Sequence, residues 1–533
     1  MDEQLVGRRV VLKRAVQAAA VGAAALTVRL SRPARGAAGS LKVNVLLDEP
    51  IGTIKPSVYS QFAEHIGGVI YDGIWVGTES KIANVDGIRK SIIDHLKRIG
   101  RVAVRWPGGC FADRYHWQDG VGPRAKRPRR FGRWQEDTES NQFGTHEFLR
   151  FCRLCEVEPY LAANVGTGSA EEFQQWVEYC NAPAGSTTLA DERASNGDRE
   201  PLAVKYWGVG NESWGCGGKF TPEDYCREYR KFTEWVPGYG VPLYLIAAGP
   251  NGNDVDWTRR FFKKWADYAR APIQGWAPHY YCGTTGHALN FSHDQWYEML
   301  FKANQMEKLI NDQWGALGEL DPEHKVKLVI DEWGAWHPAG TEINKHHLFE
   351  QMGCLRDALV AGLTLDTFNR HAEKMEMANI AQVVNNLQSL FLADGDRFVA
   401  TPNFYVFEMY RPHHNGRSVR LSVEAPEVSF QAGGKEQKLF RVAGSASLRE
   451  KRLTLTLVHT HISEPSTVAI ELRGGSAREA RQMVLTHKEL NAHNTFETPD
   501  TVLPKSSAVE GGGGTLTVTL APASVTRVDV TLM

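Results

Sequence analysis

Two glutamates stand at the ends of apolar stretches, where a side chain can emerge from a buried strand into solvent. Glu212 ends residues 204–212 and follows Asn211, and Glu332 follows the apolar run 328–330. Hydrolysis of a glycosidic bond with retention requires one carboxyl group as general acid and a second as nucleophile, about 5–5.5 Å apart. Either glutamate alone also suits a structural ion pair, but two glutamates at comparable strand ends favour a catalytic pair.

These glutamates lie within a regular alternation of strand-like and helix-like segments between about residues 57 and 390. The predicted strands are residues 57–65, 102–107, 158–165, 204–212, 242–250, 275–281, 327–333 and 364–371. The predicted helices are residues 87–99, 145–156, 170–181, 222–236, 257–269, 294–314, 346–361 and 374–392. Eight such units predict an α/β fold of the (β/α)8 TIM barrel type. A doubly wound sheet is the competing fold, but no glycine-rich phosphate loop opens a helix.

Polar side chains collect at the ends of the predicted strands. They are Glu64, His65, Arg105, Asn164, Asn211, Glu212, His279, Tyr281, Glu332, Asn369 and His371. In a barrel of parallel strands, residues at the carboxyl ends all face one mouth, where the active site lies. The pattern therefore predicts a single polar site built from several strands.

The pattern of residues changes after residue 400, from alternating strands and helices to short β-rich segments. Short β-rich segments separated by loops predict an antiparallel β-sandwich, jelly-roll-like and C-terminal to the barrel. Residues 41–47 are also strand-like and are expected to join it. The predicted division is an export signal at 1–38, a catalytic barrel at 57–400, and a sandwich of 39–56 plus 401–533.

Five stretches give the chain a specific resemblance. They are FAEHIGGVIYDGIWVG (62–77), RWPGGCFADRYHWQDGVGP (105–123), VKYWGVGNESWGCGG (204–218), LVIDEWGAWH (328–337) and MANIAQVVNNLQ (377–388). In content and order they resemble glycoside hydrolase family 51, the α-L-arabinofuranosidases. The resemblance implies a barrel with a β-sandwich and the release of terminal arabinofuranose from arabinoxylan, arabinan or their oligosaccharides.

The resemblance also implies roles for individual residues. Glu212 matches the acid/base and Glu332 the nucleophile. The other residues expected to contact substrate or orient these two are Glu64, Cys110, Asn211, His279, Tyr281, Trp333, Trp336 and Gln382. The two tryptophans are expected to line the entrance as a stacking surface. The retaining mechanism needs neither a metal nor a cofactor.

Cys110 departs from the common family pattern. It follows Pro107-Gly108-Gly109, where many family members have an asparagine that can contact a sugar hydroxyl. A thiol is a poorer hydrogen-bonding group, so the shape of the sugar subsite is in question. Cys216, four residues after Glu212, could lie near Cys110, and a disulfide between them is open.

Two further features carry alternatives. Cys152 and Cys155 have CxxC spacing, which suits redox or metal chemistry, but an apolar-periodic helix surrounds them and favours a structural role. Residues 124–133 hold six basic side chains and are expected to rim the mouth. Such a run can bind anions or a neighbouring subunit, and it is more often simply solvated.

The amino-terminal residues resemble a bacterial twin-arginine signal. Arg8 and Arg9 precede an alanine-rich run and the small residues 36–38. The sequence therefore predicts an exported enzyme, periplasmic or extracellular, without a lasting membrane anchor. An ordinary amphipathic tail is the alternative.

Composition limits the choice of partners. A formal net charge of −1 gives no global attraction to nucleic acid, whereas 15 Trp and 16 Tyr suit sugar stacking, although most aromatics are expected in the core. The expected partners are arabinose-containing polysaccharides or oligosaccharides, and family resemblance suggests a homo-oligomer, commonly a hexamer. Alternative functions are a β-xylosidase, endoglucanase or galactofuranosidase, or a non-catalytic carbohydrate-binding protein.

Overall fold

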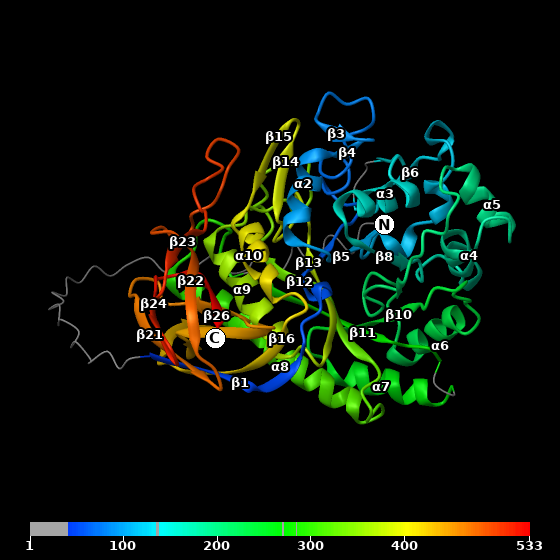
Figure 1. Cartoon of the computed structure of the whole chain (residues 1–533). Coiled ribbons are helices and arrows are strands. Elements are labelled where there is room, and N and C mark those ends of the chain that lie inside the picture. Colours follow the sequence, from blue (N-terminus) through cyan, green and yellow to red (C-terminus); the bar gives the residue numbers. More distant parts are fainter. Residues whose placement is uncertain (1–40, 135–137, 269–270, 284) are drawn as a thin grey trace, which may run out of the picture. The chain divides into compact units, whose positions relative to one another are not determined.

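The computed structural model describes residues 41–134, 138–268, 271–283 and 285–533. Within these residues, eight parallel strands close into a barrel in the order β10-β11-β12-β13-β2-β5-β8-β9 (Figure 1). Their bounds are β2 (Ser60–Phe62), β5 (Ala103–Trp106), β8 (Glu158–Ala163), β9 (Tyr206–Val209), β10 (Tyr244–Asn251), β11 (Gly275–Gly283), β12 (Lys327–Trp336) and β13 (Met375–Ala381). The predicted TIM barrel is confirmed, with β9 and β12 as its fourth and seventh strands.

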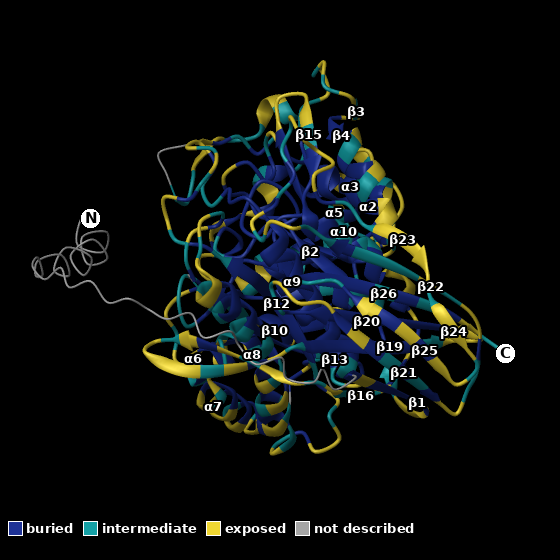
Figure 2. Cartoon of the chain, turned by 90° about the vertical axis from the view of Figure 1, so that its left-hand side faces the viewer, coloured by how far each residue is buried: buried dark blue, intermediate teal, exposed yellow. Residues whose placement is uncertain are grey.

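Helices surround the barrel, and most of them carry one apolar face that packs inward. They are α2 (Lys90–Ile99), α3 (Thr145–Cys155), α4 (Ala170–Asn181), α5 (Thr188–Ser195), α6 (Pro222–Thr233), α7 (Val255–Ala266), α8 (His293–Gly318), α9 (Leu355–Arg370) and α10 (Pro402–Tyr410). Several begin at a side-chain cap: Ser169, Thr221, Asp254 and Ser292 accept hydrogen bonds from the first-turn N–H groups of α4, α6, α7 and α8. Figure 2 shows the barrel strands buried and the outer faces of α6 and α7 exposed.

The predicted eighth strand was wrong. Residues 364–371 form the end of α9, and the strand is β13, within the segment predicted as a helix. Nearly all of α9 is buried, so it lacks the polar face that marks a helix in a sequence. Consequently Asn369 and His371 do not reach the mouth: Asn369 accepts a hydrogen bond from Tyr59, and His371 contacts Glu307 on α8.

The C-terminal part is a ten-stranded sheet, counted within the described residues, in the order β23-β22-β26-β20-β19-β16-β1-β21-β25-β24. Its strands are β1 (Leu41–Thr53), β16 (Arg417–Glu424), β19 (Val442–Arg449), β20 (Arg452–His459), β21 (Ser466–Arg473), β22 (Ala477–Thr486), β23 (Lys505–Ala508), β24 (Glu510–Gly512), β25 (Thr515–Leu520) and β26 (Ser524–Leu532). Pairing is antiparallel except between β1 and β21. The sheet curls, since Ala477 pairs with Gly513 near its far end. Its strands enclose an apolar core of their own.

Four short hairpins complete the described strands. They are β3 (Asn84–Val85) with β4 (Ile88–Arg89), β6 (Arg130–Phe131) with β7 (Thr138–Glu139), β14 (Phe391–Asp394) with β15 (Arg397–Ala400), and β17 (Glu427–Ala432) with β18 (Lys435–Phe440). Of these, β6 and β7 lie in the long connection between β5 and α3, at the mouth side of the barrel.

Polar contacts join α9 to the curled sheet. The Asn369 amide donates to Ser445 Oγ at 3.0 Å, and Arg370 donates to the Gly444 carbonyl at 2.9 Å. Ser445 in turn donates to Asp366 at 2.7 Å. These contacts give polar side chains of α9 hydrogen-bond partners in the sheet, which offsets part of the cost of burying a helix without a solvent-facing side. In the described part of the chain, no helix combines the length and apolar character needed to cross a membrane.

Candidate active site

A β-bulge in β12 turns two consecutive acidic residues toward the barrel axis. The pairing of β12 with β13 shifts between Ile330 and Trp333, so Asp331 and Glu332 occupy an irregular step. Bulges re-aim side chains in this way and are common beside active sites. Asp331 contacts Tyr160 and Asn379 inside the barrel, whereas Glu332 reaches the mouth.

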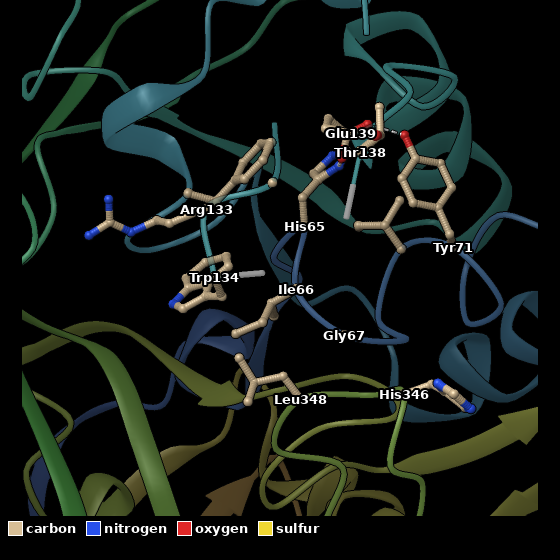
Figure 3. A pocket seen from close by; sticks show the side chains of 13 residues that line it. His65, Ile66, Gly67, Tyr71, Arg133, Trp134, Thr138, Glu139, His346 and Leu348 are labelled. Atoms are coloured by element: carbon tan, nitrogen blue, oxygen red, sulfur yellow. Dashed lines mark hydrogen bonds and ion pairs between the residues drawn. The ribbon is translucent and has the colours of Figure 1, made fainter. Parts of the chain in front are cut away.

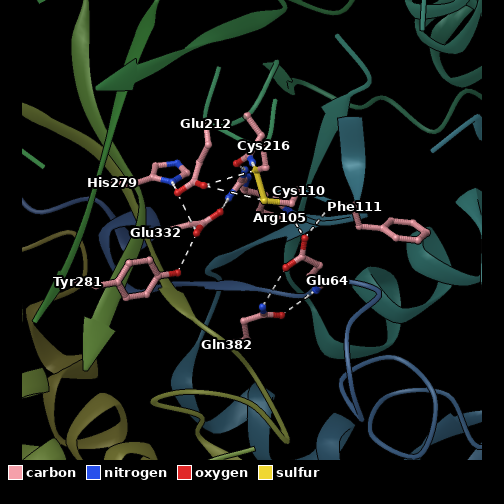
Figure 4. The surroundings of a disulfide bond; sticks show 12 residues. Glu64, Arg105, Cys110, Phe111, Glu212, Cys216, His279, Tyr281, Glu332 and Gln382 are labelled. Carbon is pink, nitrogen blue, oxygen red and sulfur yellow. Dashed lines mark hydrogen bonds and ion pairs between the residues drawn. A yellow bond between two sulfur atoms is a disulfide. The ribbon is translucent and has the colours of Figure 1, made fainter. Parts of the chain in front are cut away.

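Glu332 is buried and held by three side chains (Figure 4). Arg105 donates to its Oε1 at 2.9 Å, and the Tyr281 hydroxyl donates to its Oε2 at 2.8 Å. His279 Nδ1 lies 3.6 Å from Oε2. Burial by itself would raise the pKa of Glu332, but the charges of His279 and Arg105 outweigh it, and the pKa is lowered. Glu332 therefore stays ionised, as a nucleophile requires.

Glu212 lies on the loop that follows β9, with its backbone in the left-handed region at φ 38°. Non-glycine residues rarely adopt this conformation, and where they do it is often at a functional site. Its side chain is 19% exposed, against 9% for Glu332. His279 Nδ1 lies 3.2 Å from its Oε1.

His279 connects the two glutamates. One carboxylate oxygen of Glu212, one of Glu332 and a His279 ring nitrogen all lie within 4.8 Å of one another. Burial lowers the pKa of His279, but the charges of Glu332 and Glu212 more than offset it, so the net pKa is raised. The separation of the carboxylates suits a retaining rather than an inverting mechanism.

Arg105 is a site residue that the sequence analysis placed at a strand end without assigning it a role. It is the last residue but one of β5 and is fully buried, and its guanidinium carbon lies 4.7 Å from the centroid of the Phe62 ring. Besides Glu332 it binds the Asn211 side-chain oxygen at 2.6 Å. One guanidinium group thus connects Glu332 to Asn211, the residue before Glu212, because its N–H donors point in different directions.

Glu64 and Gln382 form a second polar group at the mouth. Oε1 of Glu64 accepts hydrogen bonds from the backbone N–H groups of Gly109 and Phe111, both at 2.9 Å. The Gln382 side chain accepts a hydrogen bond from the backbone N–H of Glu64 at 2.9 Å and donates one to Oε2 of Glu64 at 3.4 Å. Burial and then the charge of Glu332 raise the pKa of Glu64 to about 8, although the two N–H groups oppose this. The raised pKa favours the protonated form of Glu64 at neutral pH.

The two predicted entrance tryptophans lie in different places. Trp336 is half-buried beside the site, with its ring 5.1 Å from Tyr281 and 5.0 Å from Phe349. Trp333 is fully buried and packs against Phe368 and Phe407 on the helices. The prediction for Trp333 was wrong, because side chains alternate along a strand and Glu332 already faces the mouth.

Cys110 and Cys216 are joined by a disulfide, with their Cα atoms 5.6 Å apart. The Cys216 and Cys110 sulfurs lie 3.5 Å and 4.0 Å from Oε2 of Glu212. Since both sulfurs are bonded, neither carries a proton to donate. The remaining described cysteines, including the CxxC pair, are buried, and burial raises the pKa of Cys152 and Cys155.

Two groups of potential metal ligands occur among the described residues, and both involve Glu212. One contains Cys110 and Cys216, whose sulfurs are not thiolates. The other consists of Glu212, His279 and Glu332, in which His279 already bridges the carboxylates. The donor chemistry of this second group fits acid/base catalysis without further assumptions.

A separate pocket, which Phe111 helps to line, contains His65 and Glu139 (Figure 3). His65 and Glu139 meet in it at 2.8 Å, and Tyr71 also binds Glu139. Trp134 and Leu348 form part of its wall. The basic run 124–133 lies nearby, and three of its six basic side chains form ion pairs: Arg124 and Arg127 bind Glu147, and Arg130 binds Asp119.

Two protein-family models match the chain. The model described as "Alpha-L-arabinofuranosidase 1 domain" matches residues 95–293, and the model described as "Alpha-L-arabinofuranosidase C-terminal domain" matches residues 331–524.

Relatives and solved structures agree with these models. An intracellular exo-α-L-arabinofuranosidase of Bacteroides ovatus is 36% identical over 500 residues, which cover 92% of this chain and 96% of that protein. An intracellular exo-α-(1→5)-L-arabinofuranosidase of Streptomyces lividans is 28% identical, covering 89% and 73%. The crystal structure of the family 51 arabinofuranosidase from Xanthomonas axonopodis pv. citri has a TM-score of 0.87 and 37% identity, and the match covers 92% of this chain and all of that one.

These comparisons correct the predicted localisation. The Bacteroides ovatus and Streptomyces lividans relatives are both named intracellular enzymes, which contradicts the predicted export. The predicted signal, residues 1–38, lies outside the described residues. An arginine pair before an alanine-rich run is a loose compositional pattern, so it carries much less information than the long motifs around the glutamates.

Proposed function

The chain belongs to the α-L-arabinofuranosidases of glycoside hydrolase family 51, and we propose that Glu212 is its general acid/base and Glu332 its nucleophile. The enzyme is an exo-acting glycoside hydrolase that releases terminal α-L-arabinofuranose. The observation that supports the two roles is the approach of the carboxylates within 4.8 Å, one from the loop after the fourth strand and one from the seventh strand.

The first step forms a glycosyl-enzyme. Glu212, protonated, donates its proton to the glycosidic oxygen while the bond from that oxygen to C1 breaks. The Glu332 carboxylate forms a bond to C1, and the aglycone leaves as an alcohol. Arg105 and Tyr281 hold the nucleophile in place through hydrogen bonds at 2.9 and 2.8 Å, so little reorganisation is needed as charge moves.

The second step releases the sugar. Glu212, now a carboxylate, accepts a proton from water as the water oxygen bonds to C1 and the bond to Glu332 breaks. Both glutamates return to their starting protonation states. Two inversions at C1 give net retention. His279 lies against both carboxylates and supports the exchange of charge between them.

Several residues are proposed to bind the arabinofuranose. Glu64 and Gln382 offer hydrogen-bonding groups to its hydroxyls, and Asn211 offers its amide nitrogen since its oxygen is bound by Arg105. Trp336 offers a half-buried ring to the part of the substrate beyond C1. We propose arabinoxylan, arabinan or their oligosaccharides as substrates, because these carry terminal arabinofuranose.

The test is the hydrolysis of p-nitrophenyl α-L-arabinofuranoside, followed by proton NMR. We expect the α-anomer of arabinose to form first, before mutarotation. p-Nitrophenyl β-D-xyloside and β-D-galactofuranoside serve as controls for sugar specificity and should be cleaved far more slowly. Initial formation of the β-anomer would contradict the proposed roles, and preferred cleavage of either control would contradict the sugar.

We also propose the domain division and a homo-oligomer. Residues 57–400 would form the catalytic unit, braced by 41–56 and 401–533.

Support for an oligomer comes from a groove lined in part by Leu421, Val423 and Phe440, the last 44% exposed, since exposed apolar side chains often mark interfaces. Light scattering measures the mass in solution, and a monomer at micromolar concentration would contradict the oligomer.

A further inference from the structure

The Cys110–Cys216 disulfide joins the two loops that carry the active-site machinery. Cys110 ends the Pro107–Cys110 turn after β5, and Cys216 lies four residues beyond Glu212 on the loop after β9. The two cysteines are 106 residues apart in sequence. The bond therefore ties the acid/base loop directly to a turn on another strand.

That turn is itself packed against the nucleophile. A Cβ atom on Gly109 would lie 2.5 Å from Oε1 of Glu332, so only glycine fits there. The N–H groups of Gly109 and Phe111 bind Glu64. The turn is thus fixed by contacts on both sides, and it provides a rigid anchor for the other end of the disulfide.

Glu212 needs such an anchor more than Glu332 does. It lies on a loop, in a backbone conformation that is strained for a non-glycine residue. His279 contacts its Oε1, and the two sulfurs bound the space beside its Oε2 at 3.5 and 4.0 Å. Apolar sulfur atoms exclude other positions of the carboxylate without competing for its proton.

On the basis of the proposed roles, we propose that the Cys110–Cys216 disulfide is a positioning element for Glu212, and that a dithiol reductant impairs proton transfer by opening it. Reduction consumes two electrons and two protons: the disulfide becomes two thiols while the dithiol becomes a cyclic disulfide. The freed thiols can then donate to the carboxylate or, as thiolates, repel it. The loop also loses its covalent tie.

Among the described cysteines, Cys110 and Cys216 form the disulfide that a dithiol can reduce. The other described cysteines are buried as free thiols, whereas Cys110 and Cys216 are half-buried and open to the mouth. A dithiol therefore changes one bond among the described residues. Thiol titration before and after treatment should show two additional accessible groups.

The test separates proton transfer from other effects by varying the leaving group. Loss of acid assistance slows the departure of a poor leaving group, such as the sugar alcohol of an arabino-oligosaccharide, but hardly affects 2,4-dinitrophenolate, which leaves without a proton. General acid–base catalysis contributes roughly 10²–10⁴-fold. On reduction we expect kcat/KM for the oligosaccharide to fall on the order of tenfold or more, and kcat/KM for the dinitrophenyl arabinofuranoside to change by less than about twofold.

A second readout follows from the second step. With the activated substrate, impaired base assistance makes hydrolysis of the glycosyl-enzyme limiting, so kcat and KM should fall together. Azide needs no general base, and it should restore kcat. The effects should reverse on reoxidation.

The matched control is the Cys110→Ala/Cys216→Ala variant. It should show the leaving-group dependence of the reduced enzyme, and the dithiol should not change it further. If the double variant does not fold, reversible reduction of the wild type, monitored by circular dichroism, still tests the proposal.

The outcomes distinguish the disulfide from the catalytic assignment. Equal losses on both substrates, or no loss when thiol titration shows complete reduction, would overturn the positioning role. If Glu212→Ala itself lacks leaving-group dependence, the acid/base assignment fails instead, and with it the basis of this inference.

Discussion

The two glutamates proposed as acid/base and nucleophile occupy contrasting environments. Glu332 belongs to a strand, is buried, and receives hydrogen bonds from Arg105 and Tyr281. Glu212 belongs to a loop, is more exposed, and rests against a histidine and a disulfide. The nucleophile is held by charge and hydrogen bonds, whereas the acid/base is held by covalent restraint of its loop.

This difference matches what each group has to do. A nucleophile must stay ionised and point at one atom, which a fixed cation and a lowered pKa achieve. An acid/base must exchange a proton with the leaving group and then with water, which requires access to solvent. Each prediction below changes one side of this contrast.

The largest effect is expected for Glu332→Ala. Removing a nucleophile from an assembled site costs on the order of 10⁴–10⁶-fold in kcat. Azide should fill the vacant space, displace the leaving group directly and give the inverted β-azide. Restored activity that yields the α-azide would assign the nucleophile elsewhere.

Glu212→Ala should cost about 10²–10⁴-fold on oligosaccharides and far less in kcat/KM on dinitrophenyl arabinofuranoside. Here azide attacks the glycosyl-enzyme, so the product azide retains the α configuration. The configurations of the two products, read by NMR, distinguish the glutamates. If both variants gave the same anomer of the azide, the two glutamates would not have the different roles proposed for them.

Arg105→Gln tests the charge that holds the nucleophile. In the wild type the lowered pKa of Glu332 keeps the carboxylate ionised as pH falls below the ordinary range, so activity should persist there. Without the cation the pKa rises, and the acid limb of the kcat/KM profile should move to higher pH. Breaking this buried pair should also cost about 3–5 kcal/mol of unfolding free energy.

Arg98→Gln is the matched control for Arg105. Arg98 pairs with Glu408 at 2.8 Å on the surface and is 44% exposed. Such pairs contribute about 0–1 kcal/mol, and the pH profile should not move. An unchanged acid limb in Arg105→Gln would show that the cation does not control Glu332.

Glu64 adds a third carboxyl, as buried as Glu332, but its hydrogen bonds come from backbone N–H groups and an amide and none comes from a cation. Because its pKa is about 8 in the folded chain, the Glu64 carboxyl loses its proton at a lower pH in the unfolded chain than in the folded one. Its contribution therefore favours the folded state below the ordinary carboxyl pKa and is lost as pH rises toward 8. The free energy of unfolding of wild type should fall by about 2 kcal/mol or more relative to Glu64→Gln between pH 5 and 8. Parallel stability curves would contradict the raised pKa.

The smallest effect on catalysis is expected from the two tryptophans beyond Glu332. Trp336→Ala should raise KM for oligosaccharides by roughly three- to tenfold, as expected for the loss of a stacking surface, and change stability little. Trp333→Ala should instead cost about 3–5 kcal/mol of stability. Kinetics and thermal unfolding of both variants check this. If Trp333→Ala raised KM and left stability unchanged, Trp333 would belong to the entrance after all.

Much of the site was predictable because long motifs surround it. The TIM barrel, the glutamates after the fourth strand and on the seventh, and the positions of Glu64, His279 and Gln382 all followed from motifs and strand ends. The eighth strand did not, since a fully buried helix such as α9 and a buried strand such as β13 are both apolar throughout. Trp333 failed because a motif does not say which face of the strand each of its members occupies.

The sequence by itself indicated the chemistry: which carboxyl groups are proposed to react, and at the ends of which strands they lie. Tertiary structure alone decided how each is held. The bulge in β12 sends Asp331 and Glu332 inward together, Arg105 reaches across from β5, and the loops after β5 and β9 approach closely enough for Cys110 to bond Cys216. The last two features depend on distances between residues more than 100 positions apart, and local propensity does not encode such distances.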